Sequence, residues 1–156
     1  MNRGRYMKWI IPFGIACMVG ATPAAARDMV LIGSKFEKDA RAAMFIDADS
    51  VKVFGSNRRG WMYNGFSYNN RTPLTSTQLV EFDCEGEQIR VIQTDFFKLD
   101  GSYDSKGDSS PWSFPPPQTN NYVTLQFACG KISVPQANHF GDRDPFDLFQ
   151  RLFAQR

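Results

Sequence analysis

Residues 79–97, LVEFDCEGEQIRVIQTDFF, carry most of the information about the fold. From Val80 to Glu85, apolar and acidic residues alternate, which places them on opposite faces of a β-strand, with Cys84 on the apolar face. A second alternating run follows Gly86. Because the connection between the two runs is short, we predict that they pair as a β-hairpin.

The N-terminus has the three parts of a secretory signal peptide. Residues 1–8 are basic and contain no acid, and residues 9–20 are apolar but only about half as long as the roughly 20 residues that span a membrane. Ala24 and Ala26 occupy the −3 and −1 positions of an A-x-A cleavage site, so we predict a signal peptide over residues 1–26. The alternatives are an N-terminal anchor helix, or lipidation at Cys17, although the sequence before this cysteine is a poor lipid-attachment box.

Removal of the signal peptide changes the net charge. Three of the 18 basic residues lie in residues 1–26, which leaves fifteen basic against sixteen acidic residues and a net charge of −1. We do not expect a near-neutral chain without a basic block to bind nucleic acid. The remaining length suits one domain, which we place at residues 27–138, followed by a C-terminal helical tail at residues 139–156.

Two cysteines remain after cleavage, Cys84 and Cys129, together with the single histidine, His139. A structural zinc site takes four Cys or His ligands, one more than the mature chain offers. Either cysteine paired with His139 would make a nucleophile and its base, but a reactive thiol is exposed to oxidation outside the cytoplasm. An even number of cysteines in an exported chain favours a disulfide. We therefore predict a Cys84–Cys129 bond, with no metal and no cofactor.

Further strands are indicated by β-branched and aromatic residues between turn signals. The strands are expected at residues 29–38, 43–47, 51–53, 61–68, 78–85 and 88–97. Residues 47–50 (DADS) and 56–59 (SNRR) are interpreted as turns. Residues 69–76 and 98–117, rich in Asn, Asp, Gly, Ser and Pro, are interpreted as loops.

Two segments are candidate helices. Residues 119–129 alternate as a strand would, but they also fit a helix that is capped by Thr119 and ended by Gly130, and the pattern alone does not decide. In the tail, Asp144 is a cap and Pro145 suits the first helical position. The tail then carries an apolar stripe of Phe146, Leu148, Phe149, Leu152 and Phe153. This stripe either packs on the sheet or makes a dimer or membrane-surface contact.

Three short motifs resemble those of the surface-adhesin protein E family of exported bacterial domains. They are an Ile-Asp-x-x-Ser-Val box at residues 46–51, a Phe-Asp-Cys box at residues 82–84 that precedes a strand with Arg90, and a late tryptophan, Trp112, before the second cysteine. The resemblance covers about residues 30–130.

This resemblance implies a mainly β fold of the α+β class. The sheet would have about six antiparallel strands, with a helix near Cys129 and a disulfide bond from Cys84 to Cys129. The C-terminal amphipathic helix is predicted separately, from the residue pattern of the tail. The family's named member is an outer-membrane lipoprotein that binds host extracellular-matrix proteins. Here the lipid-attachment box is poor, and residues 131–156 lie beyond the shared region. The shared positions are core, turn and cysteine positions, so no ligand-binding residue is transferred.

Aromatic side chains are the candidates for binding a partner. Trp61 and Tyr63 lie on the predicted strand at residues 61–68, which is rich in aromatic residues, and Phe146 and Phe149 lie on the apolar stripe of the C-terminal tail. Either the core and a helix cover them, or they form an exposed patch for a protein partner.

Acidic groups give weaker signals. Glu81, Asp83 and Glu85 share one strand face, and we expect that face to be solvated rather than to bind a cation. Residues 100–108, DGSYDSKGD, are only faintly similar to a calcium loop, because the final bidentate acid falls on Pro111. We expect a solvated loop there.

No motif of the sequence indicates catalysis. The chain has no Gly-x-Ser-x-Gly elbow, phosphate loop or metal triad, and the paired acids Asp47 and Asp49 lie in a turn. We predict an exported, non-catalytic binding module of the bacterial envelope, in the periplasm or at the cell surface, with extracellular or envelope proteins as ligands. We also consider a homodimer. The alternative is a periplasmic structural or envelope-associated protein with no host ligand.

Overall fold

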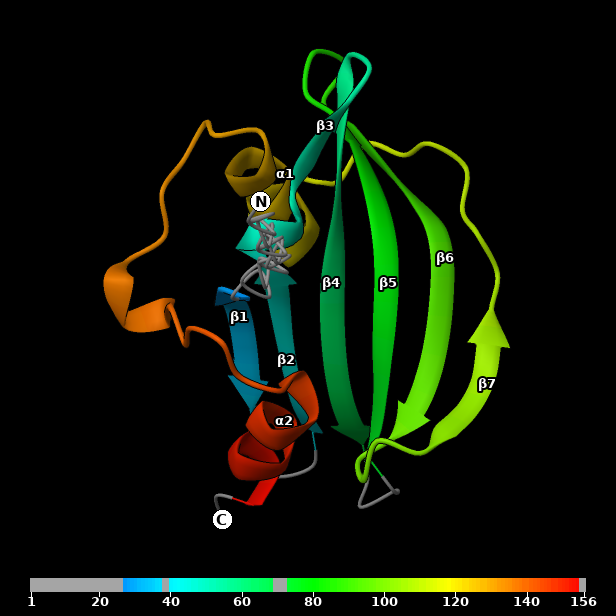
Figure 1. Cartoon of the computed structure of the whole chain (residues 1–156), viewed down its shortest axis with the longest axis vertical. Coiled ribbons are helices and arrows are strands. Elements are labelled where there is room, and N and C mark those ends of the chain that lie inside the picture. Colours follow the sequence, from blue (N-terminus) through cyan, green and yellow to red (C-terminus); the bar gives the residue numbers. More distant parts are fainter. Residues whose placement is uncertain (1–26, 38–39, 69–72, 155–156) are drawn as a thin grey trace, which may run out of the picture.

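The computed structural model describes residues 27–37, 40–68 and 73–154 (Figure 1). The predicted signal peptide, its cleavage site and Cys17 lie outside these residues. Among the helices of the described part, none has the length and hydropathy of a membrane span.

Within these ranges, seven strands form one antiparallel sheet. The strands are β1 Met29–Phe36, β2 Ala40–Asp47, β3 Lys52–Phe54, β4 Asn57–Tyr68, β5 Leu74–Asp83, β6 Gln88–Lys98 and β7 Tyr103–Gly107. Their order is β1-β2-β4-β5-β6-β7, and β3 pairs with β4 off this path. Successive hairpins therefore build the sheet, and the prediction of a mainly β, antiparallel fold is confirmed.

The helices of the described part cover opposite faces of the sheet. They are α1 Asn120–Ala128 and α2 Pro145–Ala154, and two 3-10 turns are η1 Ala48–Ser50 and η2 Gln136–Asn138. Consecutive strand residues point to opposite faces. Met62 of β4 packs in one core with Leu125 of α1, whereas its neighbour Tyr63 packs in a second core with Phe149 of α2. The alternating aromatic strand is thus covered from both sides.

Glycines set how closely the helices approach the sheet. A Cβ atom at Gly65 of β4 would collide with the ring of Phe149, and one at Gly33 of β1 would collide with the side chain of Asn120. The absence of a side chain at these two strand positions lets α2 and α1 pack against the backbone.

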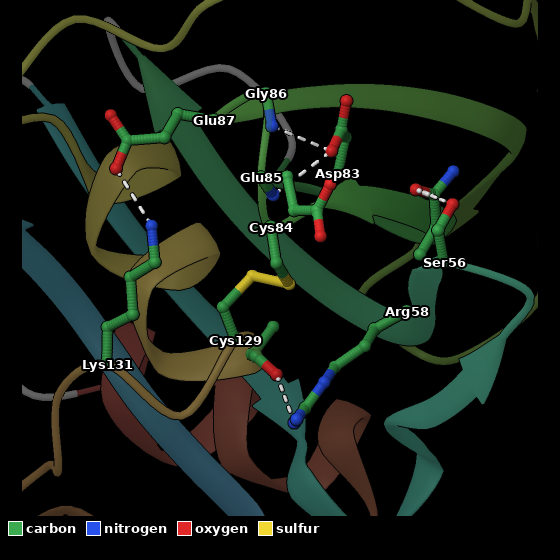
Figure 2. Close-up of a disulfide and its surroundings, with 11 residues drawn as sticks. Ser56, Arg58, Asp83, Cys84, Glu85, Gly86, Glu87, Cys129 and Lys131 are labelled. Atoms are coloured by element: carbon green, nitrogen blue, oxygen red, sulfur yellow. Dashed lines mark hydrogen bonds and ion pairs between the residues drawn. A yellow bond between two sulfur atoms is a disulfide. The ribbon is translucent and has the colours of Figure 1, made fainter.

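The predicted disulfide is present. Cys84, in the turn after β5, is bonded to Cys129 at the end of α1, with a Cα–Cα distance of 5.6 Å (Figure 2). Beside it, Arg58 of β4 donates a hydrogen bond of 2.9 Å from Nη1 to the carbonyl oxygen of Ala128. The hypothesis of a cysteine nucleophile is wrong, because both sulfur atoms are used in this bond.

A salt bridge and a histidine contact join other segments of the fold. Lys131 Nζ is 2.9 Å from Glu87 Oε1 beside the disulfide (Figure 2). The Nδ1 atom of His139 lies 2.8 Å from Asp28 Oδ2. Together with the bridge from Val30 to His139, this contact holds the segment after α1 against the edge strand β1.

Two predicted loops contain strands. β5 begins at Leu74, inside the predicted loop 69–76, and Pro73 lies just before the strand, where its missing N–H removes no ladder bond. β7 lies inside the predicted loop 98–117. As an exposed edge strand it needs no apolar face, and its Asp, Ser and Lys residues therefore lack the alternation that indicates a strand.

Both predicted helices are confirmed. The Thr119 side chain accepts a hydrogen bond from the Tyr122 backbone N–H and caps α1, which settles the ambiguous segment as a helix. Asp144 Oδ1 accepts from the Phe146 backbone N–H at 2.7 Å, and α2 begins at Pro145. Of the two interpretations of the tail stripe, packing on the sheet is the one observed.

Candidate functional site

The sheet face that carries α2 is only partly covered by that helix. α2 packs over Phe45 of β2 and Gly65 of β4. On this face α2 lies at one end of the sheet (Figure 1), and α1 packs against β4, β5 and β6 on the opposite face. Half-exposed side chains on the part of the α2 face beyond that helix are Arg59, Trp61, Leu79, Arg90 and Gln93. We call these five residues the open face.

The strand register arranges the open face in two rows. Trp61 pairs with Leu79, and Leu79 pairs with Gln93. In the next row, Arg59 pairs with Glu81, and Glu81 pairs with Arg90. Side chains that are directly opposite on neighbouring strands lie within contact distance, so an aromatic and aliphatic row lies beside a charged one.

Glu81 lies at the centre of the charged row and is only 3% exposed. Its Oε2 atom accepts hydrogen bonds from Nε and Nη2 of Arg59, at 3.3 and 3.2 Å. The same oxygen accepts from Nε and Nη2 of Arg90, at 3.1 and 2.8 Å. Oε1 accepts from Asn57 Nδ2 at 2.8 Å. Both carboxylate oxygens are therefore hydrogen-bonded, as a buried charge requires.

The Glu81 carboxyl is stabilised in its charged form. Burial by itself raises its pKa, but the hydrogen bonds from Asn57 and Arg90 and the charges of Arg59 and Arg90 outweigh burial, and the net pKa is lowered. One negative charge thus lies between two arginines, and the row keeps one positive charge.

The expectation of a solvated acidic face is wrong at Glu81. The pairing of β5 with β6 places Arg90 opposite this residue, and the pairing with β4 places Arg59 opposite it on the other side, so the two arginines cover it. Asp83, two residues on, instead closes the turn after β5, because its Oδ1 atom accepts from the backbone N–H groups of Glu85 and Gly86 at 3.1 and 2.8 Å (Figure 2).

Aromatic rings hold both guanidinium groups. The Arg59 Cζ atom lies 3.3 Å from the centroid of the Phe54 ring, and the Arg90 Cζ atom lies 4.6 Å from the ring of Trp112. Cation–π contacts of this kind restrict the arginine side chains. Two of the motif residues singled out from the sequence, Arg90 and Trp112, thus touch one another.

The four predicted partner-binding residues lie at different depths. Trp61 is partly exposed on the open face and packs against the core of Tyr63 and Phe149. Phe146 is partly exposed on α2, with its ring 5.3 Å from that of Phe97. Tyr63 and Phe149 are buried together between the sheet and α2. Their part in binding a partner stays a prediction, and Trp61 and Phe146 are the accessible members of the set.

The acids considered for catalysis shape a turn. Asp47 Oδ1 accepts from the backbone N–H groups of Asp49 and Ser50, at 3.1 and 3.3 Å, and burial raises the pKa of Asp47 despite these bonds. Ser50 Oγ donates to the Asp47 carbonyl oxygen at 2.6 Å and accepts from the Trp61 backbone N–H at 2.8 Å. The Ile-Asp-x-x-Ser box therefore positions Trp61.

The faint calcium loop is also internally bonded. Asp100 Oδ1 accepts from the backbone N–H and the hydroxyl of Ser102, at 2.9 and 2.6 Å. In the described ranges, no cluster of three or more His, Cys, Asp or Glu side chains has the arrangement of a metal site.

Most of the charged row has no signal in the local sequence pattern. Arg59 belongs to the predicted turn 56–59, whereas β4 already begins at Asn57. One signal was available in the sequence: Glu81 and Arg90 lie at opposing positions of the predicted hairpin. The second arginine becomes evident only when β4 is placed on the other side of β5.

A family model described as surface-adhesin protein E matches residues 30–130. The matched range begins in β1, ends after α1 and includes both cysteines. Comparisons with curated proteins and with solved structures found no match.

Proposed function

Because the chain belongs to the surface-adhesin protein E family, we propose that it is an exported, adhesin-like module of the bacterial envelope that binds protein partners and catalyses no reaction. The basic and apolar segments at residues 1–20 and the cleavage site at Ala26 support export. The family suggests a position at the cell surface.

The open face is the observation that carries this proposal. Trp61 and Leu79 form an apolar row beside Arg59 and Arg90. Tryptophan and arginine are enriched at protein interfaces and among the residues that contribute most to binding. Because paired strands hold these side chains, a partner would order few of them on binding.

The use of the buried acids supports binding rather than catalysis. Asp47 is hydrogen-bonded within a turn, and both oxygens of Glu81 are hydrogen-bonded to side chains of neighbouring strands. A general acid or base needs a carboxyl that reaches a substrate, and these two carboxyls have structural partners instead.

The binding test uses Trp61→Ser in the oxidised chain from residue 27 to 156. Biolayer interferometry against a panel of immobilised host extracellular-matrix proteins would show binding by the unaltered chain. We expect Trp61→Ser to weaken that binding at least tenfold, since a central tryptophan typically contributes 2 kcal/mol or more. The control is Ile132→Ser, because Ile132 is 42% exposed and lies outside the open face. Equal loss in both variants would contradict the assignment of the open face.

The location test uses intact cells. Protease treatment and surface labelling should reach the protein before the outer membrane is permeabilised. Complete protection until permeabilisation would favour the alternative, a periplasmic structural or envelope-associated protein. Light scattering on the same purified chain measures whether the homodimer considered above forms.

A further inference from the structure

A hollow lies beside the guanidinium groups of the open face. It is lined by Arg59, Arg90, Val91, Ile92, Ser109 and Ser110 and has a volume of about 260 Å³. A single water needs only about 10–15 Å³ of such space. The hollow therefore has room for a polar side chain together with part of its hydration.

The charge of the two arginines is only half neutralised. Arg59 and Arg90 both turn their Nε and Nη2 atoms to Glu81 Oε2. Two cations against one carboxylate leave one positive charge. Among the described residues, the Nη1 groups of both arginines have no hydrogen-bond partner, so each guanidinium keeps N–H donors for a ligand.

These donors are held in place before any ligand arrives. The rings of Phe54 and Trp112 lie against the two guanidinium groups. The Glu81 carboxylate accepts hydrogen bonds from the Nε and Nη2 atoms of both. The arginine side chains are 30% and 39% exposed, so solvent and ligands reach them. An arginine that is already ordered loses less side-chain entropy on binding.

A β-bulge in β6 shapes the floor of the hollow. Val80 pairs with Val91 but Leu79 pairs with Gln93, so Ile92 is an extra residue on β6. Bulges re-aim side chains and are frequent beside functional sites. Ile92 and Ser109 also line a second hollow of about 430 Å³ that includes Lys106 and Asp108. The two hollows therefore adjoin.

We propose that the Arg59–Arg90 hollow binds a carboxylate side chain of a protein partner, within a segment that also carries apolar residues. The guanidinium fork matches the geometry of a carboxylate and donates charge-assisted hydrogen bonds. Ile92 in the hollow, with Trp112 beside it, offers contacts to apolar neighbours of that acid, whereas the Val91 side chain packs in the core under α1. This inference rests on the proposed function, because it assigns the chemistry of the partner at the open face.

A sulfated polysaccharide fits these surroundings less well. A polyanion of that kind is attracted by a broad surface of one charge. Here Asp108 lines the adjoining hollow, Asp95 is the cross-strand neighbour of Lys106, and the chain from residue 27 has fifteen basic against sixteen acidic residues. A single acidic side chain requires no such surface.

The test compares two synthetic heptapeptides with blocked ends. One contains two glutamates and two phenylalanines among glycine and serine, and the other has both glutamates replaced by glutamine. Trp61 and Trp112 are the only tryptophans after residue 26, so intrinsic fluorescence of the oxidised chain reports binding near the hollow. We expect the acidic peptide to bind at least ten times more tightly than its amide counterpart, and added salt to reduce this difference.

Arginine variants locate the site. Arg59→Gln and Arg90→Gln should each weaken binding of the acidic peptide roughly tenfold or more. Arg90→Lys keeps the charge but loses the fork, so it should bind with intermediate affinity. Arg151→Gln is the matched control, because this arginine is exposed on α2 and should change nothing. If the glutamine variants fail to fold, the affinities of the unaltered chain for the acidic peptide and its amide counterpart still test whether a carboxylate is bound.

Several outcomes would overturn the inference. They are equal affinity for the two peptides, unchanged affinity in folded Arg59→Gln and Arg90→Gln, and binding of a heparin hexasaccharide without binding of the acidic peptide. If the peptides are not distinguished but Trp61→Ser still weakens matrix-protein binding, this inference fails and the proposed function stands. If the acidic peptide binds and no matrix protein does, the proposed function fails and the carboxylate site stands.

Discussion

Glu81 carries a negative charge at a strand position that water hardly reaches. The residue is 3% exposed, and three side chains donate hydrogen bonds to its two oxygens. Removing one partner from such a network leaves buried polar groups unpaired, and that loss exceeds the net value of the contacts themselves. Stability and the orientation of the two arginines therefore both depend on this one side chain.

Glu81→Gln should lower the free energy of unfolding by about 1.5–3 kcal/mol at neutral pH, because hydrogen bonds to a charged group are lost and two arginines remain close together. The lowered pKa of Glu81 sets the pH dependence. Its charged form contributes stability that is fully present above the unfolded value of about 4.3 and is lost as the pH falls through the lower folded value. Urea unfolding followed by circular dichroism at pH 7 and from pH 5 to 3 measures both effects.

The matched control is Glu85→Gln, since Glu85 is exposed and should change stability by no more than about 0.5 kcal/mol. The difference between the unaltered chain and Glu81→Gln should shrink as the solution becomes acidic. A difference that stays constant down to pH 3, or an equal effect of both substitutions, would contradict the structural role of the Glu81 charge.

At the scale of elements, α2 depends on one position of β4. Gly65 leaves the space that the Phe149 ring fills, and Phe149 is 1% exposed in the core with Phe45 and Tyr63. The helix lies outside the range matched by the family model, yet it supplies a large part of one core. The sheet and the tail helix are thus coupled through a contact between a glycine and an aromatic ring.

A double-mutant cycle tests this coupling. Gly65→Ala alone should destabilise the chain by about 1–3 kcal/mol, because the added Cβ meets the Phe149 ring. Phe149→Ala alone should cost about 3–5 kcal/mol, since it leaves a cavity. In the Phe149→Ala background the cost of Gly65→Ala should largely vanish, as the ring is gone. Free energies of unfolding from urea titrations measure the four corners, and simple additivity would show that the helix does not pack there.

At the scale of the whole molecule, the disulfide joins β5 to α1, two elements that pack in the same core. Cys84 follows β5 and Cys129 ends α1, with a sequence separation of 45 residues. Closing a loop of that length lowers the entropy of the unfolded chain, which stabilises the folded state by roughly 4 kcal/mol in the loop-entropy model. This loop contains β6, β7 and α1 (Figure 1), so the bond restrains two of the seven described strands together with one helix.

Reduction should therefore lower the melting temperature by roughly 10–15 °C for a domain of this size. Differential scanning fluorimetry with and without reductant measures the shift. A Cys84→Ala, Cys129→Ala double variant is the control: it should melt near the reduced protein and should not respond to reductant. Identical melting of the oxidised and reduced chains would mean that the bond adds nothing to stability.

The correctly predicted elements have strong local signals in the sequence. The alternation around Cys84, the caps at Thr119 and Asp144, and the cysteine pair all depend on neighbours in sequence or on the chemistry of an exported chain. β7 was missed because an edge strand exposed on both faces has no apolar alternation. Arg59 was assigned to a turn because its partner, Glu81, lies 22 residues away in sequence.

By itself, then, the sequence determined the antiparallel class, the C-terminal helix and the cysteine bond through periodicity, caps and the chemistry of an exported chain. Its short motifs indicated the family and, through the family, the helix near Cys129. Only the tertiary structure decided which residues meet. It placed α1 and α2 on opposite faces, buried Glu81 between Arg59 and Arg90 and left Trp61 half-exposed. The physical reason is that strand register and helix docking are set by contacts between distant segments, which no local pattern encodes.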